Sequence, residues 1–300
     1  MSGTPIPTPP PGKPVEPIFD HAEAVRRKKR ALRIAASGAD FLMRHAAEDL
    51  GDRLSSVQRR FDNAATLFSM TPATAEALMA SGKVGATIRV EADKALLDGS
   101  NTLVAAAETV PFAPESLDLI ASLYDLHTLN DVPGMLVQIR QALKPDGLFL
   151  GCMAGAGTLG ELREALLIAE TELTGGASPR VFPMADVRDA GALLQRARFA
   201  LPVADHETVT VRYDSMFALM HDLRAMGVTN SLIARSRRPT PKALFLRAAE
   251  IYAERFSDPD GRVRATFSTI WMSGWAPHAS QQKPARRGSA TVSLAKILGE

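Results

Sequence analysis

The 300-residue sequence has little from which a covalent or metal-bound framework is built. Its single cysteine, Cys152, excludes an internal disulfide and suits a reducing compartment. Because Cys152 lies within an apolar run, we expect it to be a small core residue. The six histidines are scattered, without a pair at metal-ligand spacing, so the sequence predicts no metal site.

Long apolar runs and a large charge of one sign are also missing. No run approaches the ~20 residues of a membrane span, so we expect at most peripheral contact with a membrane. Residues 1–17 are rich in proline and lack the apolar segment of a signal peptide, which predicts a disordered tail on a cytoplasmic bacterial protein. The net charge of +2 gives no reason to expect nucleic acid as a partner.

Short basic clusters occur, of which Arg26–Arg30 is an example. Such clusters are typical of solvated helix faces. The alternative is a docking surface for an acidic partner or for the inner face of an anionic membrane.

Short apolar runs alternate with helical segments from about residue 63 onward. Such alternation is typical of a parallel sheet with helices on both faces. The predicted strands are Ala64–Ser69, Thr87–Glu91, Thr102–Ala105, Leu117–Leu123, Leu148–Met153, Thr208–Tyr213 and Ala265–Trp275.

Two further helical regions, residues 18–50 and 216–256, lie outside this alternation. The predicted organisation lists a tail (1–17), an N-terminal helical segment (18–62), a core (63–213 and 263–297) and a helical insertion (214–262). The insertion is long enough to be a lid or a partner surface. Trp271 and Trp275 are four residues apart on an extended segment, so we expect both on one face, anchoring the insertion.

Specific motifs follow one another at set intervals after residue 110. They are Val110-Pro111-Phe112, Ser116-Leu117-Asp118-Leu119-Ile120, Leu126-His127 and Leu143-Lys144-Pro145-Asp146-Gly147. This series resembles the second half of a class I (Rossmann-like) S-adenosylmethionine-dependent methyltransferase.

Later motifs narrow the resemblance. They include Gly175-Gly176-x-Ser178-Pro179 and the closing Arg287-Gly288-Ser289-Ala290-Thr291-Val292. These segments resemble the complex I assembly factor 5 family, methyltransferase-fold proteins of mitochondria and alphaproteobacteria. That family is related to the biotin-pathway malonyl carrier-protein methyltransferase.

The resemblance implies an α/β fold with a mostly parallel seven-stranded sheet, N-terminal helices and a helical insertion between the last two strands. It also implies S-adenosylmethionine as cofactor, no metal, and a complex I subunit as partner. Members are usually labelled methyltransferases by fold. The family is also associated with modifying an arginine of a complex I subunit, apparently by hydroxylation.

The loop after the first predicted strand departs from the family pattern. Thr66 stands where the family has an acid, and Phe68, Met70 and Pro72 replace its three glycines. Glycine lets the backbone turn sharply and lets the cofactor's amino-acid end lie against it without a Cβ in the way. Pro72 also removes a backbone donor. We therefore expect the loop to exclude ordinary binding of S-adenosylmethionine.

The resemblance makes Glu91, Ala107 and Leu123 the remaining cofactor-binding positions. Glu91 closes the second predicted strand, where an acid of this fold accepts hydrogen bonds from the ribose hydroxyls. An acid at a strand end is also commonly just solvated. The loop that usually presents an aspartate to the adenine has Ala106 and Ala107 instead.

Substrate or partner contacts are predicted at Tyr124, Asp125 and His127, which follow the fourth strand. Ligands of open α/β folds bind at this edge of the sheet, so Asp125 or His127 is a candidate proton acceptor. The alternative is a structural His127, hydrogen-bonded to backbone at a helix start. Arg287 and Ser289 either bind an anionic group or a partner's carboxylate, or tie the C-terminal segment to the domain.

Three functions are consistent with these motifs. The first is an assembly factor that keeps the fold and the partner surface but has lost ordinary cofactor binding and catalysis. The second is a working methyltransferase or arginine hydroxylase with an unusual pocket. The third is a carrier-protein methyltransferase of the biotin pathway. The Gly175-Gly176-x-Ser178-Pro179 motif and the closing Arg287-Gly288-Ser289 segment favour the assembly factors over the carrier-protein methyltransferases.

Overall fold

The structure is a computed structural model, which describes residues 16–34 and 37–282. Two short 3-10 helices, η1 (Lys94–Leu96) and η2 (Leu126–Thr128), accompany the helices and strands. The helices are α1 (His21–Ile34), α2 (Phe41–Ser55), α3 (Ala73–Ala80), α4 (Val132–Ala142), α5 (Gly160–Thr174), α6 (Val187–Arg196), α7 (Met216–Ala225) and α8 (Lys242–Phe256). The strands are β1 (Phe61–Leu67), β2 (Val84–Glu91), β3 (Thr102–Val104), β4 (Leu117–Leu123), β5 (Leu143–Ala154), β6 (Ala200–Tyr213) and β7 (Val263–Trp275).

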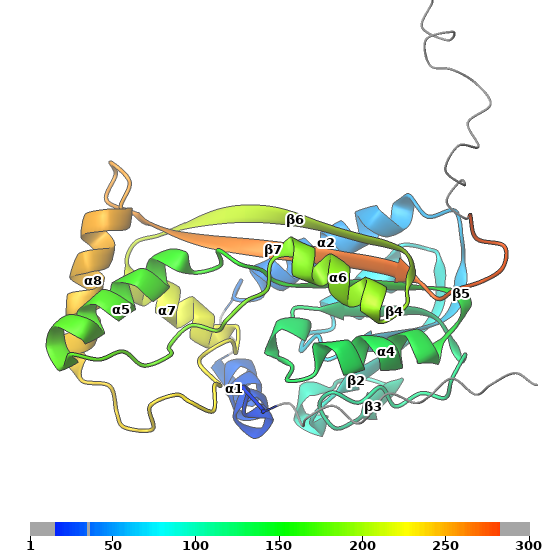
Figure 1. The fold of residues 1–300 in the computed structure, drawn as a ribbon, viewed down its shortest axis with the longest axis horizontal. Helices are drawn as coiled ribbons and strands as arrows, with labels where there is room; N and C mark the ends of the chain where they lie inside the picture. Colours follow the sequence, from blue (N-terminus) through cyan, green and yellow to red (C-terminus); the bar gives the residue numbers. More distant parts are fainter. Residues whose placement is uncertain (1–15, 35–36, 283–300) are drawn as a thin grey trace, which may run out of the picture.

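One seven-stranded sheet runs through the molecule in the order β3-β2-β1-β4-β5-β7-β6 (Figure 1). The pairs from β3 to β5 are all parallel. Only β7 reverses, lying antiparallel to both β5 and β6. This topology confirms the predicted mostly parallel α/β sheet, with α1 and α2 before it and a helical insertion between its last two strands.

Helices cover both faces of the sheet because its central strands are apolar on both sides. Leu50 and Leu54 of α2 and Leu78 of α3 pack on one face, against a strand cluster that includes Cys152. Helices α4 and α6 pack on the other face. Cys152 is fully buried, which confirms its predicted place in the core and raises the pKa of its thiol to about 12.

A third apolar cluster lies at the end of the molecule where β6 and β7 run on beyond the rest of the sheet (Figure 1). Helices α5, α7 and α8 form this cluster together with the ends of the two strands. The longest helices of the described residues have 15 residues. Over the residues that the structure describes, none of the helices combines the length and hydropathy of a membrane span.

The structure corrects several predicted boundaries. The helix expected over residues 18–50 is two helices, separated by a turn in which Gly38 has a φ of 75°. The helix expected over 216–256 is also two, α7 and α8, and Gly227 follows α7 with a φ of 77°. Strand β6 begins at Ala200 rather than Thr208, because β7 pairs with its polar first half.

The predicted role of the two tryptophans is wrong. Trp271 is fully buried and packs with the α2 cluster, and Trp275 packs against the same cluster. The Arg53 guanidinium lies 4.3 Å from the centroid of the Trp271 ring. Both tryptophans therefore anchor α2 to the sheet. The insertion helices α7 and α8 pack instead in the separate cluster with α5.

Replacing Trp271 with alanine should lower the free energy of unfolding by about 3–5 kcal/mol, because the change empties a large volume in a closed core. Urea denaturation followed by far-UV circular dichroism measures this loss. The matched control is Phe217→Ala, since Phe217 is 45% exposed and its loss should change stability by less than about 0.5 kcal/mol. Equal effects of the two substitutions would contradict the assignment of Trp271 to the core.

Candidate functional site

The loop Phe68–Pro72 joins β1 to α3 at the carboxyl edge of the sheet. Phe68 and Met70 have φ values of 55° and 60°, in the left-handed region that glycine adopts most easily. The Phe68 ring is nevertheless buried, and its backbone N–H donates to the Val90 carbonyl at 2.8 Å. The backbone is thus one that suits glycine, and each large side chain held in it costs on the order of 1 kcal/mol.

Glu91 ends β2 directly beside this loop. Its Oε1 accepts a 2.6 Å hydrogen bond from the Met70 N–H, whereas its buried Oε2 has no hydrogen-bond partner among the described residues. The residue is only 2% exposed. Burial raises the pKa of Glu91 to about 7, although the nearby Lys28 opposes the shift.

Lys28 enters the same edge from α1. Its Nζ lies 3.0 Å from Oδ1 of Asp125 and donates to the Phe68 carbonyl at 3.3 Å. Burial alone would lower the pKa of Lys28, but the carboxylates of Asp125 and Glu91 outweigh it, and the pKa lies above its usual value. The ammonium group therefore stays charged and joins α1 to the loops after β1 and β4.

These residues do not fit S-adenosylmethionine as the resembling fold holds it. Phe68 and Met70 put side chains where the cofactor's amino-acid end needs bare backbone. Glu91 lies under Met70, next to the Lys28–Asp125 pair, and lines neither of the two cavities found near this edge. The acid predicted to hold ribose hydroxyls is thus closed off in this structure.

The three candidates after β4 differ in their surroundings. The Tyr124 hydroxyl shares a 2.6 Å hydrogen bond with Oγ1 of Thr269, and Asp125 is paired with Lys28. Nδ1 of His127 accepts a long 3.4 Å hydrogen bond from the Ala154 N–H. Burial, with a smaller effect of the Lys28 charge, lowers the pKa of His127 to about 4, so its imidazole is neutral at pH 7. Their predicted roles stay predictions.

The other predicted site residues are spread out. Thr66 and Leu123 are buried in their strands, and the Leu123 N–H donates to Oγ of Ser69 at 3.3 Å. Pro72 precedes α3 as its cap residue, and Ala107 lines a shallow cavity beside α1. Arg287 and Ser289 lie outside the described residues, as does most of the predicted N-terminal tail.

A cavity of about 740 Å³ lies between the carboxyl edge, helix α1 and the insertion. Tyr124 and His127 line it from the sheet side, so it brings together two of the residues that the sequence predicts. Met220 and Met226 line it from the insertion. Among the described residues, Asp40 is the one acid in the lining of this cavity. Six arginines also line it: Arg27, Arg30, Arg44, Arg180, Arg224 and Arg235.

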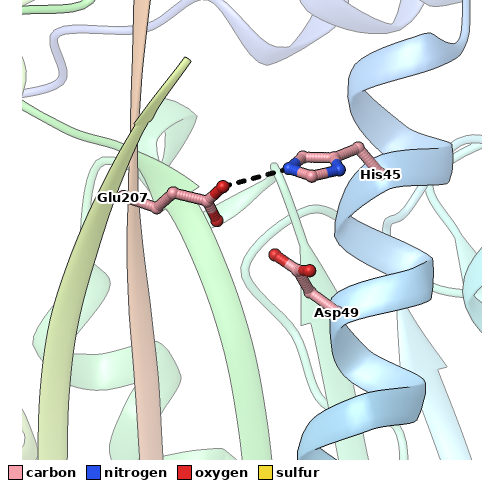
Figure 2. A group of neighbouring side chains, drawn as sticks. All are labelled: His45, Asp49 and Glu207. Carbon is pink, nitrogen blue, oxygen red and sulfur yellow. Dashed lines mark hydrogen bonds and ion pairs between the residues drawn. The ribbon is translucent and has the colours of Figure 1, made fainter.

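A cluster of one histidine and two carboxylates connects α2 to β6. His45 and Asp49 lie one turn apart on α2, and Glu207 points toward them from β6 (Figure 2). Nε2 of His45 is 3.2 Å from Oε1 of Glu207. Each of the three residues has one nitrogen or oxygen atom that could bind a metal ion, and these atoms lie within 4.8 Å of one another. The bond to Glu207 raises the pKa of His45, whereas burial and the nearby Glu207 raise that of Asp49.

Sequence reasoning missed both Lys28 and this cluster. Lys28 lies within the basic run Arg26–Arg30, for which the sequence predicts a solvated face or a docking surface, and its burial depends on where α1 docks. His45 and Asp49 have the four-residue spacing of one helix face, which is a visible signal. Glu207 comes 162 residues after His45, and the pairing of β6 with β7 brings it close.

Comparison with known proteins places this geometry among methyltransferases. Residues 71–151 match the family described as "Methyltransferase domain". "Arginine-hydroxylase NDUFAF5, mitochondrial" from Danio rerio is 37% identical over 288 residues, covering 93% of this chain and 89% of that protein. "Malonyl-[acyl-carrier protein] O-methyltransferase" from Xylella fastidiosa is 36% identical over 171 residues, covering 57% and 56%. The solved YcgJ protein from Bacillus subtilis superposes with a TM-score of 0.53 at 17% identity, covering 78% of this chain and 100% of that chain.

The strand order and the matched domain define a class I methyltransferase fold. Within that class, the chain belongs to the NDUFAF5 family, because the zebrafish relative matches it over most of both chains. This confirms the resemblance that the later motifs predict. The match to the carrier-protein methyltransferase covers little more than half of either chain.

Glu91→Gln should change how stability depends on pH. The pKa of Glu91 is about 7 in the folded protein and 4.5 ordinarily, so the folded state holds the proton more tightly. The stability that this proton confers is full below pH 4.5 and is lost as the pH rises through 7. Urea denaturation between pH 4.5 and 8 should show the wild type losing on the order of 3 kcal/mol relative to the variant.

Glu254→Gln, at an exposed position of α8, is the matched control for this measurement. It should follow the wild-type profile throughout. Parallel profiles for the wild type and Glu91→Gln would show that Glu91 is not buried in the way described.

Proposed function

We propose that this protein acts in the assembly of respiratory complex I by binding a complex I subunit, and that it does so without S-adenosylmethionine. The observation that carries the proposal is the carboxyl edge of the sheet, where the Phe68–Pro72 loop leaves no room for the cofactor. Phe68 and Met70 replace bare backbone, and Lys28 ties α1 over the buried Glu91. Binding a protein needs the fold and its outer surfaces, and it does not require this edge to open.

The family supports the assembly role, since the zebrafish relative of similar length is an NDUFAF5 protein. The helices around the insertion supply a surface for a partner. Leu167 of α5, Phe217 of α7 and Leu246 of α8 are 49%, 45% and 57% exposed. Helices α5, α7 and α8 pack into one cluster, and we propose that their outer faces together form the partner surface. We infer a cytoplasmic location in a bacterium, with at most peripheral contact at the inner face of the membrane.

Arginine hydroxylation is the second candidate, and the name of the Danio rerio relative, arginine-hydroxylase, favours it. The cavity beside the sheet edge speaks against it here. A substrate guanidinium would meet Arg30 and Arg224, which no carboxylate of the described residues pairs with, and these like charges repel it. Methylation of a carrier protein, the activity in the name of the Xylella relative, has the weaker support of a partial match and needs the cofactor that the loop opposes.

Calorimetric titration with S-adenosylmethionine tests the closed edge. The purified protein should show no saturable heat up to millimolar cofactor, which corresponds to less than about 4 kcal/mol of binding free energy. The physical reason is steric, because Phe68 and Met70 fill the volume beside the loop. A cofactor-binding methyltransferase in the same buffer is the positive control. Stoichiometric binding in the micromolar range would refute the proposal that the protein works without this cofactor.

Deleting the gene should reduce assembled complex I in the membranes, measured by native gel electrophoresis and by NADH dehydrogenase activity. The wild-type gene and the Glu91→Gln variant should both restore it, since the proposed role uses no cofactor. Mass spectrometry of the complex I subunits should give the same arginine-peptide masses in every strain. A gain of one oxygen that depends on this gene would support hydroxylation instead, and unchanged complex I levels would refute the assembly role.

A further inference from the structure

We propose that the 740 Å³ cavity binds an anionic amphiphile, a molecule with one acidic head group on an unbranched alkyl chain. The inference goes beyond the assembly role, because it concerns a small ligand of the isolated protein. It rests on three features of the cavity, which are its size, its apolar wall and the charges at its rim.

The size and the wall suit an alkyl chain. Ligand pockets commonly enclose about 300–1,000 Å³ and are mostly apolar, and this cavity lies within that range. Leu159, Leu162 and Leu166 succeed one another at the spacing of one helix face and line the cavity from the start of α5. Phe182 and Phe267 continue this apolar wall.

Two pairs of polar residues on the cavity floor, Tyr124 with Thr269 and Thr158 with Ser268, bond to one another. The Tyr124 hydroxyl bonds to Thr269. Thr158 donates to the Ser268 carbonyl at 2.9 Å and accepts from the Ser268 N–H at the same distance. A chain that offers no hydrogen bonds can lie over these groups without leaving them unsatisfied.

The charges at the rim select the sign of the head group. Four of the six lining arginines have acidic partners: Arg27 pairs with Glu23, Arg44 with Asp40, Arg180 with Glu170 and Arg235 with Asp20. Within residues 16–34 and 37–282, no carboxylate pairs with the other two, Arg30 and Arg224.

Arg30 and Arg224 come from two helices that pack together. Arg30 lies on α1 and Arg224 on α7, and a Cβ added to Gly227 would lie only 3.1 Å from the Lys28 Cα. Burial lowers the pKa of Arg27 although Glu23 opposes the shift, and the nearby charges of Arg235 and Arg30 lower it further. Two guanidinium groups without partners at the mouth of an apolar cavity favour a carboxylate or phosphate head.

Other ligand classes satisfy these features less well. A basic or arginine-containing peptide segment would add positive charge to the rim. Inorganic phosphate would leave the apolar wall in contact with water, and a neutral lipid would leave both guanidinium groups without a partner. Fatty acids and phosphorylated lipids share the required chemistry, and the experiment compares them.

The test is isothermal titration of the full chain with dodecanoate and with dodecyl phosphate, each below its critical micelle concentration. Dodecanoate represents a fatty-acid source and dodecyl phosphate a phospholipid headgroup on a chain of the same length, so the tighter binder identifies the source. Each should bind at one site per chain. Inorganic phosphate and dodecyltrimethylammonium should bind at least about tenfold more weakly, because each lacks one of the two recognised parts.

The double variant Arg30→Gln/Arg224→Gln should weaken the binding of both anionic amphiphiles about tenfold or more. Both residues are exposed, so the variant should keep the wild-type melting temperature, and the two single variants replace it if it does not fold. Arg255→Gln, which removes an exposed arginine paired with Glu164 outside the cavity lining, should leave affinity unchanged.

Equal affinity for the cationic amphiphile would overturn the proposal, as would unchanged affinity in both the double and the single variants. Absence of saturable binding by either anionic amphiphile would overturn it as well. The titration uses no partner protein, so none of these results bears on complex I binding.

Discussion

The ammonium group of Lys28 holds together parts of the chain that are far apart in sequence. It pairs with Asp125, 97 residues away, and donates to the carbonyl of Phe68. Because both partners of the ion pair are largely buried, separating them would leave an uncompensated charge, which costs several kcal/mol in such sites. Helix α1 is therefore fixed over the carboxyl edge of the sheet. Its position covers Glu91 on one side and forms a wall of the large cavity on the other.

Much of the fold follows from the sequence, because β4 and the second half of β5 are largely apolar runs and most of the helices have clear periodicity. The errors have physical reasons. The first half of β6 contains Asp205, His206 and Glu207, so its sequence lacks the apolar pattern of a strand. It is extended because it pairs with β7. Each of the two long predicted helices is interrupted where a glycine adopts the left-handed region. Gly38 lies in the turn before α2, and Gly227 follows α7 at the start of the non-helical segment that leads to α8.

The site is less predictable than the fold. The loss of the loop glycines is visible in the sequence, and so is the acid at Glu91. The ion pair between Lys28 and Asp125 that occupies the carboxyl edge of the sheet is not visible in the sequence. Lys28 is one of several neighbouring basic residues, and it becomes buried only when α1 docks on the sheet. The arginine-lined cavity also forms only through tertiary packing, because its lining residues come from α1, α2, α5, α7 and the loops around residues 180 and 235.

The last two strands have a mechanical consequence. Pairing of β7 with β5 stops at Thr269, whereas its pairing with β6 runs on to Val263, so a two-stranded ribbon leaves the edge of the wide sheet toward α7 and α8 (Figure 1). Ribbons of two strands twist more readily than broad sheets. A slight coiling of this ribbon would swing its helices as one lever arm, with the cluster of α5, α7 and α8 kept intact. Because α7 also packs against α1, which Lys28 fixes to the sheet edge, that contact would resist the movement.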